Sequence, residues 1–116
     1  MQRMKNLLDA LAECGEMAAF YKGQKIVMVN GLLADLFGRE IDEFEGLPIV
    51  EILNEESIDL IRDFIRRREH GDSGVPITYK AAFRTPDNPK TYLTLTVLKT
   101  SNTGGALLVI LQKNGQ

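Results

Sequence analysis

The chain has little of the chemistry that builds metal centres and covalent cross-links. It contains one cysteine, Cys14, and one histidine, His70, in 116 residues. A lone cysteine cannot form an internal disulfide, and neither residue has the partners that a Cys or His metal centre requires. We therefore expect no metal site. The apolar core must therefore stabilise the domain without disulfides or metal ions, which is possible for a chain of this length.

Long apolar runs and an excess of basic charge are also missing. No stretch approaches the roughly 20 apolar residues of a membrane span, and the N-terminus lacks the basic and then apolar order of a signal peptide. The net charge is -2 and the isoelectric point about 5.4, whereas nucleic-acid-binding domains usually carry a basic excess. We expect a cytoplasmic protein, or a cytoplasmic part of a larger one, with neither membrane nor nucleic acid among its partners.

Catalytic patterns are absent from the sequence as well. Ser57, Ser73 and Ser101 stand at turns or helix starts with no histidine base placed near them, and no glycine-rich phosphate loop occurs. The carboxylates occupy cap positions and exposed helix faces. A small enzyme would need a carboxylate pointing inward near Tyr79, and the periodicity places none there. The sequence predicts no catalytic residues and no enzyme.

The most informative stretch runs from residue 26 to residue 38. It opens with an apolar, β-branched run that is typical of a buried strand, and continues with apolar residues at helical spacing. Asn30 stands at the junction and is predicted to cap the helix, because its side-chain oxygen can accept from N–H groups of the first turn. Gly38 is predicted to end this helix in the left-handed conformation, and Gly46 to end the short turn that follows.

The remaining periodicities predict the other elements. The strands 17–21, 26–29 and 106–111 are apolar on both faces, which predicts central strands covered twice. The strands 75–85 and 90–100 alternate and should be half exposed. A long helix over 54–70 has its buried stripe at Ile58, Leu60, Ile61, Phe64 and Ile65. Its basic run at 66–68 suits the dipole of the last turn, and we interpret it as solvated rather than phosphate-binding.

The N-terminal residues 2–15 are predicted to form an amphipathic helix. Its apolar stripe must pack on something, because two heptads are too few for an independent coiled coil. Two interpretations remain open: the helix covers the second face of the sheet and also contacts a second copy, or it is local cover only. We expect a dimerisation or capping segment at 1–15 and a domain at 16–113. The stripe consists of Met4, Leu7, Leu8, Leu11 and Cys14.

A family resemblance appears in the central stretch. The pattern V-x-V-N-x-x-x-x-x-L-F-G followed by D-E-F-x-G, with residues Val27, Val29, Asn30, Leu36, Phe37, Gly38, Glu43 and Gly46, resembles the PAS family of small sensor and interaction domains. The order of elements is also that of the family. The resemblance implies an α+β PAS fold: a five-stranded antiparallel sheet in the order 2-1-5-4-3, with helices on one face and the N-terminal amphipathic helix.

The resemblance also implies a function in signalling. Such a domain would be a non-catalytic sensory or dimerisation module of a histidine kinase, diguanylate cyclase or transcription regulator. It would form a homodimer and relay a change in its pocket or dimer geometry to an output domain in cis or in trans. The alternative is a stand-alone protein that binds a small ligand or cofactor.

The cofactor-binding branches of the family require specific residues. Flavin photosensing of the LOV type needs a cysteine after the first hairpin, whereas Cys14 precedes it. Haem sensing of the best-known type needs an axial histidine on or just after the long helix, and His70 lies there in a charged run typical of a solvated position. We therefore expect neither flavin nor haem, and either no cofactor or an unknown small apolar ligand.

The resemblance places any pocket between the sheet and the helices. A filled core is one alternative, and a cavity for a small apolar or weakly polar molecule is the other. Only the Tyr79 hydroxyl offers a polar contact. The expected lining residues are Phe37, Ile52, Leu53, Ile61, Ile65, Tyr79, Ala81, Phe83, Leu93, Leu95 and Leu108.

Overall fold

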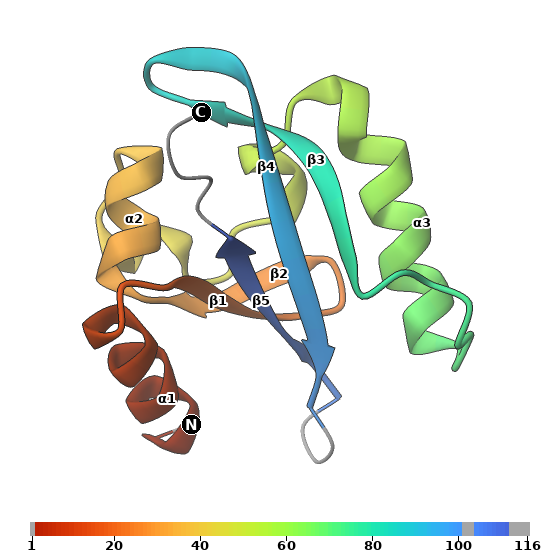
Figure 1. Ribbon diagram of the computed structural model, residues 1–116, viewed down its shortest axis with the longest axis horizontal. Coiled ribbons are helices and arrows are strands. Elements are labelled where there is room, and N and C mark those ends of the chain that lie inside the picture. The colour runs from red at the N-terminus through yellow and green to blue at the C-terminus, as the bar shows by residue number, and fades with distance from the viewer. Residues whose placement is uncertain (1, 101–103, 112–116) are drawn as a thin grey trace.

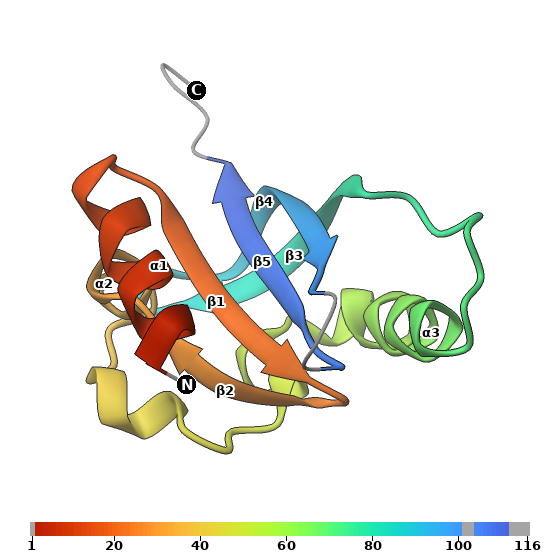
Figure 2. The ribbon, with the colours of Figure 1, turned by 90° about the horizontal axis from the view of Figure 1, so that it is seen from below.

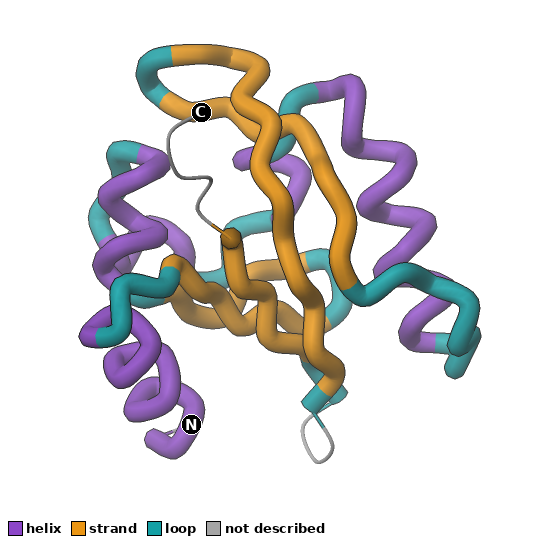
Figure 3. The backbone as a smooth tube through the Cα atoms, viewed as in Figure 1, coloured by secondary structure: helices purple, strands orange, loops and turns teal. Residues whose placement is uncertain are grey.

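The computed structural model describes residues 2–100 and 104–111 (Figure 1). Ser101, which the sequence places at a turn, and the expected domain end at residue 113 lie outside these ranges. Figure 3 shows which parts of the chain are helix, strand and loop. In order they are α1 (Gln2–Glu13), β1 (Met17–Lys22), β2 (Lys25–Val29), α2 (Gly31–Phe37), the 3-10 helices η1 (Ile41–Phe44), η2 (Ile49–Ile52) and η3 (Glu55–Ser57), α3 (Ile58–Glu69), β3 (Thr78–Thr85), β4 (Asn88–Lys99) and β5 (Ala106–Leu111).

The five strands form one antiparallel sheet in the order β2-β1-β5-β4-β3. This order confirms the fold class expected from the sequence. Successive side chains of a strand point to opposite faces of the sheet. One set of side chains therefore faces α2, α3 and the 3-10 helices, and the other set faces away from them. We call these the inner and the outer face of the sheet.

The main core lies on the inner face. Its most enclosed side chains include Leu33 of α2, Phe44 of η1 and Leu95 of β4. The Phe37 ring meets Phe44 edge-on at 6.3 Å between centroids and lies 5.8 Å from Phe83. These aromatic contacts hold α2 and η1 onto the sheet.

The N-terminal helix covers part of the outer face. Leu8 of α1 is only 1% exposed and packs with Ala18, Phe20 and Leu107, flanked by Met4 and Leu11. Figure 2 shows α1 lying along β1. The structure confirms that this helix covers the sheet, and the expected contact of the helix with a second copy stays a prediction.

One predicted buried position, Leu60, is wrong, and two residues of the predicted stripe of α1 lie outside its contact with the sheet. The buried line of α1 runs through Met4, Leu8 and Leu11, whereas Leu7 is 42% exposed and Cys14 is exposed. A helix turns about 100° per residue, so centring the stripe on Leu8 turns Leu7 away from the sheet. Leu60 of α3 is exposed for the same reason, because the buried stripe follows Ile61, Phe64 and Ile65.

The strand boundaries and the place of β2 also differ from expectation. The pairing of β3 with β4 begins at Thr78 and not at Val75, so Ile77 is exposed. Strand β2, expected to be central, lies at one edge of the sheet. The edge is nevertheless occupied, because the Ile26 N–H donates to Leu47 O at 2.8 Å and the Ile49 N–H donates to Gln24 O at 2.9 Å.

The opposite edge, formed by β3, is bonded in the same way at one end. The Asn54 N–H donates to Ala82 O at 3.0 Å, and the Ala82 N–H donates to the buried Ser57 Oγ at 2.9 Å. Both edge strands are therefore met by the chain's own connecting segments, those around η2 and η3.

Candidate functional site

The site expected from the sequence lies between the inner face of the sheet and α3. A cavity of about 10 Å³ remains there, which we call the inner cavity. This is about the least space that one water molecule needs, so the core is close to filled. Its lining is Tyr21, Ile49, Leu53, Ile61, Ile65, Tyr79, Phe83, Leu95 and Leu108.

Most of the expected pocket residues line this inner cavity, and the others belong to the core around it or pack against that core. Ala81 is buried in the same core cluster, and Leu93 packs against it partly buried. Phe37 and Ile52 belong to the cluster as well, but they line a surface groove beside Arg39 and Pro86. The structure thus gathers all of the expected residues in one core, with Phe37, Ile52, Ala81 and Leu93 outside the cavity lining.

A larger cavity of about 290 Å³ opens next to the inner one, and we call it the mouth cavity. It lies where the β1–β2 turn, the start of β5 and the end of α3 approach one another. Tyr21 and Ile65 line both cavities and form the wall between them. The described lining is Tyr21, Gly23, Ile65, Arg68, Glu69, Lys99, Gly104, Gly105 and Ala106.

Strand pairing explains how one row of residues on the sheet lines the bottom of the mouth cavity. Ala106 of β5 pairs with Tyr21 of β1 on one side and with Lys99 of β4 on the other. The three form a cross-strand row on the inner face. Above this row, Arg68 follows Ile61 and Ile65 on α3 at positions i+7 and i+3, which places it on the same helix face.

Arg68 differs in its contacts from the arginines beside it. Its Nη1 donates to Tyr21 Oη at 3.3 Å and its Nη2 donates to the Pro76 carbonyl at 3.0 Å. Arg66 and Arg67 instead pair with carboxylates, Arg66 with Asp63 and Arg67 with both Asp63 and Asp72. Arg68 therefore links α3 to the sheet through neutral partners.

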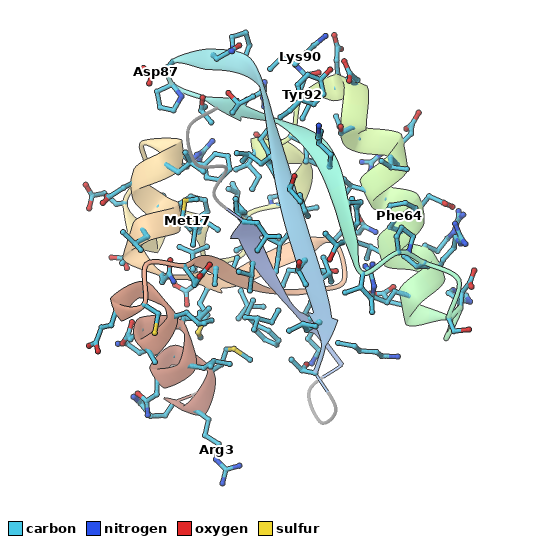
Figure 4. The ribbon with its side chains drawn as sticks, in the orientation of Figure 1. Arg3, Met17, Phe64, Asp87, Lys90 and Tyr92 are labelled. Atoms are coloured by element: carbon cyan, nitrogen blue, oxygen red, sulfur yellow. The ribbon has the colours of Figure 1, made fainter. Side chains whose placement is uncertain are left out.

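Two tyrosine hydroxyls lie near the Arg68 guanidinium. Burial raises the pKa of Tyr21, and the charge of Arg68 partly opposes the shift. Burial likewise raises the pKa of Tyr79 to about 12, with a further rise from Tyr21 and an opposing effect of Arg68. Both hydroxyls are therefore protonated at neutral pH and can donate hydrogen bonds. The Tyr79 ring is held edge-on against Phe64, 4.8 Å between centroids. Figure 4 labels Phe64 on α3.

The Asn30 side chain connects four parts of the domain. Its Oδ1 accepts from the Leu33 N–H at 3.1 Å, which confirms the predicted cap of α2, and from the Ala18 N–H at 3.3 Å. Its Nδ2 donates to Leu8 O of α1 and to Glu16 O, each at 3.0 Å. The amide thus ties α1, the connection from α1 to β1, the start of β1 and the start of α2 together in a buried position.

The two predicted glycine stops have the expected conformation. Gly38 ends α2 with φ 66°, and Gly46 follows η1 with φ 77°. A side chain at Gly38 would also collide with the Pro86 ring, because an ideal Cβ there falls 2.6 Å from Pro86 Cγ. The glycine therefore lets the β3–β4 turn approach the end of α2.

Tyr21, Arg68 and Lys99 are the residues of the mouth that the sequence interpretation missed. Tyr21 was assigned to an apolar strand, and Arg68 to a solvated basic run. The available signal was the spacing of Arg68 from Ile61 and Ile65, which continues the buried stripe. Nothing local in the sequence shows that Lys99 and Tyr21 share a row, because that depends on the register of β5.

The residues considered for cofactor chemistry lie away from both cavities. Cys14 is exposed beyond the end of α1, and His70 is exposed at the end of α3. Among residues 2–100 and 104–111, no group of three or more His, Cys, Asp or Glu side chains is placed to hold a metal ion. Over the same described ranges, no helix is both long and apolar enough to cross a membrane.

No protein-family model matches the sequence, and the comparison with curated proteins finds no match. Solved structures do resemble it. A domain of a sensory box sensor histidine kinase/response regulator from Geobacter sulfurreducens aligns with a TM-score of 0.71 at 17% identity, covering 94% of this chain and 94% of that chain.

Two further solved structures were determined with small molecules bound. The PAS domain of the RpfR quorum-sensing receptor from Cronobacter turicensis, in complex with C12:0, gives a TM-score of 0.73 at 10% identity over 84% of this chain and 92% of that chain. The PAS domain of a LuxR-family transcriptional regulator from Burkholderia thailandensis, in complex with ethanol, gives 0.68 at 10% identity over 92% and 94%. At such low identities the likeness concerns the fold alone.

Proposed function

We propose that this chain, which has the PAS fold, is a non-catalytic sensory and dimerisation module of a signal-transduction protein. The observation that carries the proposal is the almost wholly apolar cavity between the sheet and α3, in a fold shared with domains of a sensor kinase and of a transcriptional regulator. The module relays a change in this cavity, or in the contact between two copies, to an output domain of a kinase, cyclase or transcription regulator.

The sensed molecule in this proposal is small and apolar. The support is the lining of the inner cavity and the occurrence of C12:0 and ethanol in two domains of the same fold. Because the inner cavity has a volume of only about 10 Å³, binding must move side chains of α3 or β1 outward. That movement is the physical link between occupancy and signal.

Mass spectrometry of small molecules released from the denatured, purified protein tests this part, together with an absorption spectrum. We expect a colourless protein that carries a small apolar molecule or takes one up in a titration. A visible chromophore in stoichiometric amount would contradict it and favour the alternative, a cofactor-binding protein.

The dimer contact in this proposal combines α1 with the uncovered part of the outer sheet face. Leu98 of β4 is 48% exposed, although its cross-strand neighbour Leu107 is buried under Leu8. Leu111 and Leu7 are large exposed apolar side chains as well. A second copy placed there would bury them, and each well-buried leucine contributes about 1.5–3 kcal/mol.

Light scattering after size exclusion tests the dimer with two matched variants. We expect the wild-type chain to have the mass of a dimer and Leu98→Glu that of a monomer, because a carboxylate would be buried without a partner. Leu60→Glu is the control, since Leu60 is similarly exposed but lies on α3. A wild-type chain that is monomeric at high concentration would contradict the contact.

A further inference from the structure

Two cationic side chains, Arg68 and Lys99, line the mouth cavity. Within residues 2–100 and 104–111 neither forms an ion pair, whereas the neighbouring Arg66 and Arg67 of α3 do. Arg68 is half-buried and bonded to a hydroxyl and a carbonyl, both neutral. A guanidinium that is held in place and still unpaired with a carboxylate is a preformed partner for an anion.

The groups around Arg68 suit an anion as well. The Tyr21 hydroxyl lies within hydrogen-bond distance of the guanidinium at 3.3 Å, and burial keeps it protonated and able to donate. Lys99 approaches from the other end of the row Tyr21–Ala106–Lys99 on the sheet floor. Donors on α3, β1 and β4 thus converge on one space of about 290 Å³, close to the lower end of the usual ligand-pocket range of about 300 Å³.

One carboxylate, Glu69, lines the same cavity. It lies on the side of the β1–β2 turn, where its Oε2 is 3.7 Å from the ideal Cβ position of Gly23. Glu69 is exposed, so solvent screens its charge. With Arg68 and Lys99 against this one acid, the mouth keeps a net positive charge.

The floor of the mouth leads into apolar surface. The side chains that separate the two cavities are Tyr21 and Ile65, and behind them lie only apolar groups and the Tyr79 hydroxyl. A molecule seated at the mouth therefore meets positive charge at one end and hydrocarbon at the other. A ligand that extends from the mouth cavity into the inner cavity would therefore bind with its polar end at the mouth and its apolar end inside.

We propose that the ligand of this domain is a monocarboxylate with an aliphatic tail, whose carboxylate is bound by Arg68, Lys99 and the Tyr21 hydroxyl while the tail displaces the Tyr21–Ile65 wall. The inference rests on the proposed function, because it assigns a chemical class to the molecule sensed by the same core. It adds a charged head-group site to a cavity that otherwise predicts only apolar selectivity.

A matched pair of probes tests the inference on the full chain. Octanoate and octan-1-ol share the chain length and differ in the charged head group. Titrations followed by amide chemical shifts give the dissociation constant of each and locate the binding. We expect octanoate to bind at least about tenfold more tightly than octan-1-ol, because one charge-assisted hydrogen bond to the half-buried Arg68 guanidinium contributes about that factor. The largest chemical-shift changes should lie at Tyr21, Ile65 and Ala106.

Three variants assign the preference to the mouth. Arg68→Gln should remove most of the preference for octanoate and leave the octan-1-ol affinity within about twofold. Lys99→Gln should weaken octanoate binding about threefold. The Lys99 side chain is exposed and forms no ion pair among the described residues, so this variant should stay folded and keeps the test valid if Arg68→Gln does not. Arg62→Gln is the control, since Arg62 is an exposed cation of the same helix away from the mouth.

The possible outcomes separate this inference from the proposed function. Equal affinities for octanoate and octan-1-ol overturn the carboxylate site and leave an apolar sensor in place. Binding of neither probe overturns both the head-group site and the sensing of an apolar molecule. An octanoate preference that survives Arg68→Gln and Lys99→Gln, or that Arg62→Gln reduces equally, also overturns the inference.

Discussion

Replacement of Asn30 by alanine is the sharpest test of how this domain is held together. The side chain is 1% exposed and makes four hydrogen bonds, two as acceptor and two as donor. Capping alone is worth about 1 kcal/mol. Loss of a hydrogen bond that leaves a buried group unpaired adds about 1–3 kcal/mol, and the bond to Leu8 O is buried whereas that to Glu16 O is only partly buried.

We therefore expect Asn30→Ala to lower the free energy of unfolding by about 3 kcal/mol. Urea denaturation followed by circular dichroism measures this directly. Asn54→Ala is the matched control. Its side chain also caps a helix, by accepting from the Glu56 N–H at 2.9 Å, and donates to Pro89 O at 2.8 Å, but both bonds are exposed. It should cost about 1 kcal/mol or less.

A second variant isolates the link to α1. Asn30→Asp keeps the acceptor for the Leu33 and Ala18 N–H groups but removes both donors and places a carboxylate against two carbonyl oxygens. We expect hydrogen exchange in α1 to accelerate selectively, while α2 stays protected. If Asn30→Ala cost no more than Asn54→Ala, or if α1 kept its protection in Asn30→Asp, the assignment of Asn30 as the connecting residue would be refuted.

Two further predictions follow from the contacts described above. Leu8→Ala should cost about 2–5 kcal/mol, because it empties the contact with Phe20, whereas Leu7→Ala should change stability by less than about 0.5 kcal/mol; thermal or urea unfolding of both variants would contradict the assigned helix face if the two costs were equal. The hydrogen bond from Tyr92 Oη to Glu56 at 2.6 Å, and then the neighbouring Lys90, lower the pKa of Glu56. Since this pKa is depressed on folding, the contribution of the cluster is present above the unfolded pKa and is lost as the pH falls through the folded pKa. Carboxyl NMR titration should show the Glu56 pKa rising toward its ordinary value in Tyr92→Phe, and an unchanged pKa would contradict the bond.

The parts of the fold that could be predicted are those with a local signal. Asn30 and Gly38 bracket a short helix with cap chemistry that depends on neighbouring residues only, and the structure confirms both. The order of the sheet followed from the resemblance. By contrast, Leu7 and Leu8 are both compatible with a stripe of this spacing, and only the position of Phe20 on the outer face decides between them.

The candidate site was predictable as a core and not as a site with a charged entrance. Apolar periodicity identifies Leu53, Ile61 and Leu95 as buried whether or not a ligand lies among them. The mouth depends on three strands and one helix meeting in register, with Ala106 pairing to Tyr21 and to Lys99 at once. Sequence spacing carries information about one element at a time, so this combination appears only in three dimensions.

The bonded edges of the sheet have a consequence for self-association. A strand from another chain can extend a sheet only where a ladder of free N–H and C=O groups invites it. Here the segment around η2 occupies part of the β2 edge and the segment before η3 occupies one end of the β3 edge. Strand addition is thereby hindered at both edges. In the proposed dimer the copies would instead meet through the outer face of the sheet, and a two-fold contact of that kind would give a closed pair and not an open-ended fibre.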